Sequence, residues 1–243
     1  MKLIPTLLLF IYVRCLAHTD TSLVYLNKAN TTTVKDSAFS VLKIYRENDA
    51  WHGREYYLKN DVLKSEGNFE SNSIDRRIGS FKNFTDSGQL DFVVSYENYQ
   101  PAEFTYYYKD GSKKSWLQLS GTNIKAQTGW DESGKEIKGF IVKRDPQFKG
   151  GINGWLRYLE KNLNGMAPIN AGMASGRYTA YITFNISKTG KISEIKAWSS
   201  SCKSCEEAAI NVVSRSRDWQ PAIFQNEPVD YFGHKLGITF IVP

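Results

Sequence analysis

The residues best suited to chemistry are the two cysteines of Cys202-Lys-Ser-Cys205. They follow an expected strand and open an expected helix, where the helix dipole lowers the pKa of a thiol, as in thioredoxin-like redox sites. The same spacing suits a structural disulfide in an oxidising compartment. Because the surrounding pattern lacks the alternating strand–helix–strand order of the redox fold, we favour a structural disulfide between Cys202 and Cys205. Free regulatory thiols and dithiol catalysis are the alternatives.

The other groups that could catalyse a reaction are isolated. His18, His52 and His234 are far apart in the sequence, and His234 in the last strand is expected at the surface or in a turn. Gly190-Lys191 lacks the upstream glycine of a phosphate-binding loop. No second cysteine pair or nearby histidine completes the four ligands of a zinc site. The sequence therefore predicts no catalytic residue, no metal site, no cofactor and no enzymatic activity.

The composition indicates a soluble globular protein that is rich in β structure. The chain has 243 residues, of which 41% are hydrophobic and 23% are charged, and these are ordinary values for folded domains. Its 14 tyrosines and 13 phenylalanines favour half-buried β surface. The formal net charge is +6, but the basic residues are scattered and form no stripe, so nucleic-acid binding is not expected. The charge suits an exported protein that faces acidic surfaces.

The first 17 residues are typical of a signal peptide. Lys2 gives a positive start, residues 3–13 are uncharged and apolar, and Ala17 offers a small residue for cleavage. The apolar run is shorter than the roughly 20 residues that cross a bilayer. Arg14 makes a poor lipoprotein signal before Cys15, yet a lipid on Cys15 and a retained short anchor are the two alternatives to cleavage. Export leaves the remaining two cysteines free to oxidise.

Residues 18–146 predict a β-rich region. Gly88, Gly111 and Gly134 are evenly spaced, and each ends a phrase of an aromatic residue, polar residues and glycine. Such phrases predict tight hairpin turns, because glycine readily adopts the positive φ that these turns require.

A second phrase, Gly-x-Phe, occurs at Gly67-Asn-Phe69 and at Gly79-Ser-Phe81. One hairpin cannot bury its apolar face alone, so we expect several copies to stack. The repeating pattern, which is clearest over residues 51–137, resembles the bacterial form of MORN-type repeats.

Residues 147–243 predict a second domain. A helix is expected after Gly151, where apolar residues recur at three- and four-residue spacing and form one face. Residues 178–187 and 192–198 predict a hairpin, and a capping box of Ser204 and Glu207 predicts a second helix that runs to Arg217. The expected apolar face of the first helix comprises Ile152, Trp155, Leu156, Leu159 and Leu163.

The last predicted element is a long alternating strand over residues 229–242. Period-two alternation places successive side chains on opposite faces of a sheet. The inward-facing residues are then Phe232, Leu236, Ile238 and Phe240, and the outward-facing residues include Tyr231, Lys235 and Thr239.

This second region resembles the C-terminal domain of TonB-type energy transducers. The resemblance rests on Phe148-Lys-Gly-Gly151, Thr189-Gly190-Lys191, Glu207-Ala208, Trp219-Gln-Pro221 and Pro228-Val229. It implies an α+β fold in which two helices pack on one face of a three-stranded antiparallel sheet.

In the family that it resembles, the last strand pairs with the extended TonB-box segment of an outer-membrane transporter by β-augmentation. The resemblance therefore implies a partner-binding strand that includes Tyr231, Gly233, Lys235, Gly237 and Thr239. The alternative is that this edge is covered by another copy of the chain, as a homodimer, or by the repeats.

Energy transducers also carry an inner-membrane helix and a long proline-rich spacer, and neither is visible here. We therefore expect a periplasmic protein of the Gram-negative cell envelope that takes part in TonB-dependent transport as a transducer or as an adaptor. A protein- or glycan-binding scaffold built on the repeats is the second hypothesis, and a dithiol redox protein is the third.

Overall fold

The computed structural model describes residues 21–217 and 219–243. The predicted signal peptide, Cys15 and His18 lie outside the described residues. The fold is α+β, as predicted: an antiparallel sheet comes first, and helices with further sheets follow. The chain divides into two compact units, Met1–Phe104 and Thr105–Pro243. The predicted domain boundary near residue 146 remains a prediction.

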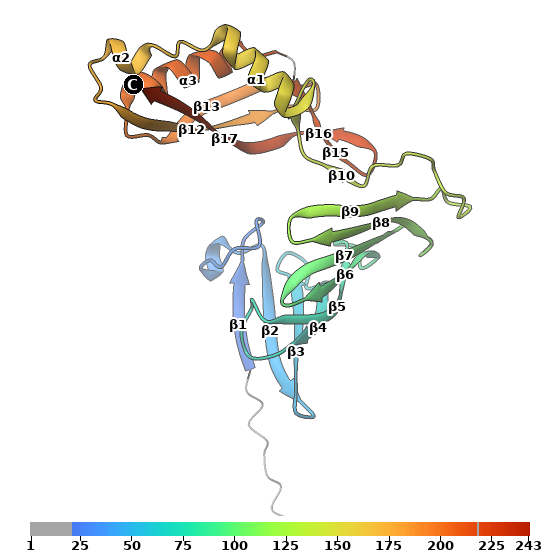
Figure 1. The fold of residues 1–243 in the computed structure, drawn as a ribbon. Helices are drawn as coiled ribbons and strands as arrows, with labels where there is room; N and C mark the ends of the chain where they lie inside the picture. Colours follow the sequence, from blue (N-terminus) through green and yellow to red (C-terminus); the bar gives the residue numbers. More distant parts are fainter. Residues whose placement is uncertain (1–20, 218) are drawn as a thin grey trace, which may run out of the picture. The chain divides into compact units, whose positions relative to one another are not determined.

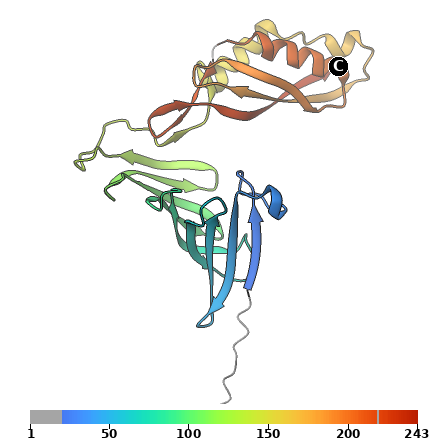
Figure 2. The same ribbon diagram turned by 180° about the vertical axis from the view of Figure 1, so that it is seen from behind.

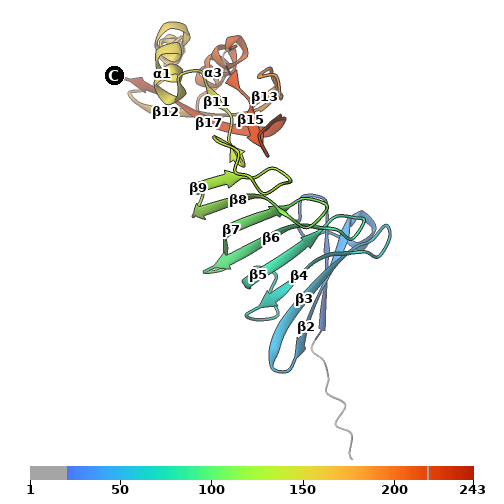
Figure 3. The same cartoon turned by 90° about the vertical axis from the view of Figure 1, so that its right-hand side faces the viewer.

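The first sheet has nine strands in the order of the sequence, so that each strand follows its chain neighbour (Figure 3). Consecutive strands are joined by hairpins, which is why this order arises from local turns alone. The nine strands are β1 Thr21–Leu26, β2 Ser40–Glu47, β3 Ala50–Tyr57, β4 Leu63–Phe69, β5 Arg77–Phe84, β6 Leu90–Glu97, β7 Gln100–Tyr107, β8 Lys113–Ser120 and β9 Asn123–Gly129.

The evenly spaced glycines form three similar turns. Gly88, Gly111 and Gly134 have φ values of 83°, 86° and 83°. Each donates its N–H to the carbonyl of the residue three positions earlier, at 2.9, 3.0 and 2.9 Å. The φ values and these hydrogen bonds confirm the predicted turns. Glycine occupies these positions because other residues rarely adopt this φ. The sheet is compatible with MORN-type repeats, and that resemblance stays a prediction.

Glycine and phenylalanine interlock across neighbouring strands on the buried face of this sheet. A Cβ on Gly53 would lie 2.2 Å from the Phe69 ring, and a Cβ on Gly67 would lie 2.4 Å from the Phe81 ring. Each ring therefore covers a glycine of the preceding strand, and both rings are buried. Gly67-Asn-Phe69 supplies one glycine and one ring on the same face, which explains the spacing of that phrase.

The C-terminal part builds a three-stranded sheet in the order β13-β12-β17, with α1 and α3 on one face (Figures 1 and 2). This arrangement confirms the helix and strand content that the resemblance implies. The bounds are α1 Gly151–Asn162, α2 Ala167–Asn170, β12 Gly176–Ile186, β13 Ile192–Ser199, α3 Lys203–Arg215 and β17 Tyr231–Val242.

Short strands connect and flank these elements. They form a sheet in the order β10-β15-β16 and a separate pair of β11 and β14. Their bounds are β10 Lys143–Arg144, β11 Gln147–Phe148, β14 Trp219–Gln220, β15 Ala222–Phe224 and β16 Glu227–Val229. Residues 143, 144 and 147, at the start of this part of the chain, are thus paired backbone.

The predicted capping box at the start of α3 is wrong. The helix is capped by Cys202, whose sulfur accepts a hydrogen bond from the Cys205 N–H at 3.1 Å. The sulfur therefore satisfies a free N–H of the first turn, which was the role expected of the Ser204 hydroxyl. The helix also ends at Arg215, two residues earlier than predicted.

The prediction for Phe232 is also wrong. Its side chain is 76% exposed, whereas Leu236, Ile238 and Phe240 face inward as expected. The cause is a register shift between Phe184 and Ile186 of β12, next to Gly233 with φ of 68°. An extra residue in one strand reverses the faces of the residues beyond it.

The interlock of glycine and phenylalanine can be tested by Gly67→Ala. The new methyl group would overlap the buried Phe81 ring, and overpacking of this kind costs about 1–3 kcal/mol. Urea unfolding of the full chain should show this loss in the free energy of unfolding.

Gly165→Ala is the matched control, because a Cβ at that glycine meets no atom within 4 Å. Equal stability of Gly67→Ala and Gly165→Ala would contradict the interlock.

Candidate functional site

Strand β17 is an open edge of the C-terminal sheet. Nine consecutive residues, His234 to Val242, pair with β12 without a register shift, and no other strand of the described chain pairs with β17. Of the predicted partner-binding residues, Lys235, Gly237 and Thr239 lie in this regular stretch. Gly233 lies at the register shift and Tyr231 lies beyond it. The geometry thus keeps three of the five residues on one continuous edge, and their role in binding stays a prediction.

The opposite edge, β13, has a different character. Its pairing with β12 is interrupted by two register shifts, and Glu194 has a positive φ of 54°. Bulges of this kind twist an edge and prevent a further strand from pairing with it. The regular β17 edge carries no such protection, so it is the edge to which a foreign strand can add.

An apolar groove runs between α1 and β17. It has a volume of about 790 Å³. Ile152 and Leu156 of α1 are 69% and 54% exposed, whereas Trp155 is buried. The groove is lined from the helix side mainly by Ile152, Leu156 and Leu159 and from the strand side by Leu236, Gly237 and Ile238.

The sequence prediction missed this groove, because it assigned the whole apolar face of α1 to the core. The structure buries only part of that face. The width of this apolar face could have indicated the groove. Trp155 and Leu156 are adjacent in the helix and point about 100° apart, so one contact with the sheet cannot cover both.

Trp219 fixes the position of α1. Its ring lies 5.5 Å from the Phe148 ring and 5.5 Å from the Trp155 ring, measured between centroids. Phe148 and Trp219 are also paired in register, since β11 pairs with β14. The indole N–H of Trp219 donates to the Ser216 hydroxyl at 2.8 Å. The two sequence motifs that flank the domain therefore meet in one aromatic cluster that holds the helix.

The face of the sheet opposite the helices carries exposed aromatic side chains. The rings of Tyr181 and Trp198 lie 5.4 Å apart, and the Lys235 ammonium lies 5.1 Å from the Trp198 ring centroid. A Cβ on Gly237 would lie 3.2 Å from the Tyr181 ring, so glycine allows this ring to lie across β17. Lys235 is therefore held by a cation–π contact next to the open edge.

His234 was predicted to be a surface or turn residue, and this prediction is wrong. The side chain faces inward, with its ring 5.2 Å from that of Phe184 and 5.3 Å from that of Trp219. Burial lowers the pKa of His234 below its usual value, and the negative charge of Asp145 opposes this shift. The neutral imidazole is thus the form that fits the cluster.

A lowered pKa links His234 to stability. The unfolded chain takes up a proton near pH 6.5, whereas the folded chain resists protonation until a lower pH. The free energy of unfolding should therefore be steady above about pH 6.5 and fall as the pH drops below it, by at most about 1.4 kcal/mol per pH unit from this group.

The measurement is urea unfolding between pH 7.5 and 5.5 for the native chain and for His234→Phe, which retains a ring in the cluster. The variant should lose less stability on acidification than the native chain. Identical pH dependence in the two proteins would contradict the assignment.

The two cysteines lie at the distance of a disulfide bond. Both side chains are buried, and thiol–disulfide exchange requires access of an attacking thiolate to a sulfur. The arrangement suits a bond that rigidifies the start of α3.

Replacement of both Cys202 and Cys205 by serine should lower the free energy of unfolding by about 2 kcal/mol or less, because the closed loop is very short. The native protein, with its disulfide formed, should not catalyse the reduction of insulin by dithiothreitol. Catalysis that disappears in the double variant would restore the redox hypothesis.

Residues 21–217 and 219–243 contain no cluster of three or more His, Cys, Asp or Glu side chains that could hold a metal ion. Among the helices that these residues form, none combines the length and the apolar composition needed to span a membrane.

Part of the chain is similar to a known protein family. Residues 178–242 match the family model described as Gram-negative bacterial TonB protein C-terminal. The match covers β12, β13, α3 and β17, and so includes the open edge. It supports a TonB-like C-terminal region and relates this region to proteins of the Gram-negative envelope. No curated protein matches the chain.

Proposed function

We propose that the protein acts in the envelope of a Gram-negative bacterium, where its C-terminal part binds extended segments of outer-membrane transporters. The proposal includes a role in TonB-dependent transport, as a transducer or as an adaptor. The observation that carries it is the regular edge from His234 to Val242, which pairs with no strand but β12 within the described chain. The family match at residues 178–242 supports it.

The main chain of β17 supplies the affinity. In an antiparallel sheet, every second residue of an edge strand directs both its N–H and its C=O away from the neighbouring strand. Nine regularly paired residues therefore offer four or five residues to an added strand. Main-chain recognition tolerates many side chains on the partner, which suits a protein that serves several transporters.

The apolar groove supplies selectivity. Side chains of an added strand alternate between the two faces of the sheet, so every second side chain of the partner would face α1. Ile152 and Leu156 offer those side chains an apolar surface. The preferred partner is therefore an extended segment with apolar residues at alternate positions. Ordering of such a segment opposes binding and keeps the affinity moderate.

Strand addition can be tested with synthetic peptides that cover the TonB-box segments of outer-membrane transporters of the same organism. Two versions of each peptide carry backbone N-methyl groups, one at odd and the other at even positions. Only residues that face β17 need their N–H groups, so one version should lose binding and the other should retain it. Equal binding by both versions would exclude main-chain pairing.

Amide hydrogen exchange locates the site on the protein. The peptide should slow exchange at alternate residues between Lys235 and Val242 and leave β13 unchanged. Protection confined to β13, or protection of β17 without peptide in a concentration-dependent dimer, would overturn the proposal.

The groove is tested by Leu156→Glu. The residue is exposed, so stability should be little affected, but a charge would replace the apolar surface that the partner contacts. Loss of one buried leucine contact corresponds to roughly tenfold or more in peptide affinity, measured by isothermal titration.

Val34→Glu is the matched control, because Val34 is 70% exposed and lies in the other compact unit. An equal loss of affinity in both variants would show that the groove does not take part.

A further inference from the structure

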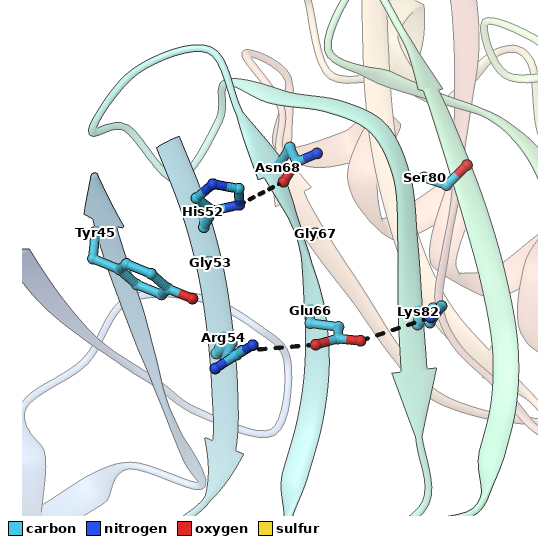
Figure 4. Close-up of a pocket in the computed structure, with 9 residues that line it drawn as sticks. All are labelled: Tyr45, His52, Gly53, Arg54, Glu66, Gly67, Asn68, Ser80 and Lys82. Atoms are coloured by element: carbon cyan, nitrogen blue, oxygen red, sulfur yellow. Dashed lines mark hydrogen bonds and ion pairs between the residues drawn. The ribbon is translucent and has the colours of Figure 1, made fainter. Parts of the chain in front are cut away.

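A polar slot lies on the face of the N-terminal sheet opposite the buried Phe69 and Phe81 rings (Figure 4). It extends over β2, β3, β4 and β5 and has a volume of about 210 Å³. Two rows of side chains border it, because residues two positions apart in a strand share a face. The side chains that line it include those of Tyr45, Asn68, Ser80, Arg54, Glu66 and Lys82.

The first row offers rings and an amide. Tyr45 pairs in register with His52, and His52 with Asn68. The His52 Nδ1 donates to the Asn68 Oδ1 at 2.9 Å, which leaves the Nδ2 group of that amide without a partner among the described residues. The Tyr45 hydroxyl points toward the slot (Figure 4). This row therefore combines a ring surface with free hydrogen-bond donors.

The second row carries an excess of positive charge. Glu66 lies between Arg54 and Lys82, with N–O distances of 3.7 and 3.9 Å (Figure 4). Lys43 pairs directly opposite Arg54 but does not line the slot, and its ammonium lies 5.6 Å from the Tyr45 ring centroid. Both N–O distances are too long for good hydrogen bonds, and half-exposed pairs of this kind are weakly held. The cations are therefore free to turn toward an anionic ligand.

A β-bulge completes the slot. The register between β4 and β5 jumps between Glu66 and Asn68, and Gly79 has a positive φ of 64°. The bulge brings the Ser80 hydroxyl to the border of the slot. Bulges commonly redirect a side chain in this way next to binding sites.

We infer that the polar slot binds an acidic saccharide, that is, a sugar ring that carries a carboxylate. Donors outnumber acceptors in the slot, so the ligand must be rich in acceptors and negatively charged. The guanidinium of Arg54 can bind a carboxylate with two parallel hydrogen bonds. Sugar hydroxyls suit the Asn68 amide and the Ser80 hydroxyl, and the Tyr45 ring can pack on the apolar face of a sugar. The slot is shallow, which suits one unit of a polymer.

The test is titration of the full protein with trigalacturonate and with the neutral trisaccharide maltotriose, followed by NMR chemical shifts. Trigalacturonate should shift signals of Tyr45, Asn68 and Ser80, and its affinity should exceed that of maltotriose at least tenfold. Arg54→Gln and Lys82→Gln should each weaken it at least fivefold.

Lys59→Gln is the matched control, because Lys59 has the same charge and a side-chain exposure of 58%, against 59% for Lys82. Tyr45→Ala should weaken the binding of trigalacturonate but not the binding of sulfate. Equal affinity for maltotriose, equal affinity for sulfate, an equal loss in Lys59→Gln, or no binding at all would each overturn the assignment.

Discussion

The aromatic cluster around Trp219 is the interaction on which the C-terminal part depends. Phe148 enters it from before α1 and Trp219 from after α3, so the cluster closes the domain between two distant parts of the chain. Because Trp155 is drawn into the cluster, α1 is held by one flank of its apolar face. The other flank, with Ile152 and Leu156, remains exposed beside β17. The groove is thus a consequence of how the helix is anchored.

The two edges of the C-terminal sheet show that the exposure of β17 has a structural cause. Register shifts and the strained backbone of Glu194 disrupt β13, and such features keep other strands from pairing. The same device occurs in β17 only at Gly233, near its start. A chain that protects one edge and leaves nine residues of the other regular has an edge suited to a partner. This contrast, rather than openness alone, favours strand addition.

Local patterns predicted most of the fold, because they depend on residues close in sequence. The turn glycines, the alternation of β12 and the apolar spacing of α1 each correspond to an element in the structure. The predictions failed where contacts between distant parts of the chain determine which way a side chain faces. A bulge places the Phe232 side chain on the exposed face of the sheet, and the His234 side chain packs inward among aromatic rings. Glu55 would pass for a surface residue of β3, yet it is buried and bonded to Lys64.

The candidate site, too, could be predicted only in part. The edge strand could be found from sequence, since a long alternating final strand in a small sheet must have a free side. Which of its residues form the regular edge could not, because that depends on the register with β12, and register is a property of two distant segments.

The hydrogen bonds that join the C-terminal part to β8 and to the segment that follows β9 could not be predicted either. The tip of the β15–β16 hairpin bonds to the segment that follows β9: the Gln225 and Asn226 N–H groups donate to the carbonyls of Val142 and Ile141 at 2.9 and 2.7 Å. The Ser115 hydroxyl of β8 donates to the Gln225 side chain at 2.9 Å. Since β16 leads directly into β17, β17 is joined to the segment that follows β9 by hydrogen-bonded backbone as well as through the chain itself. Movement of β17 would therefore be transmitted to this hairpin and, through its hydrogen bonds, to the segment that follows β9.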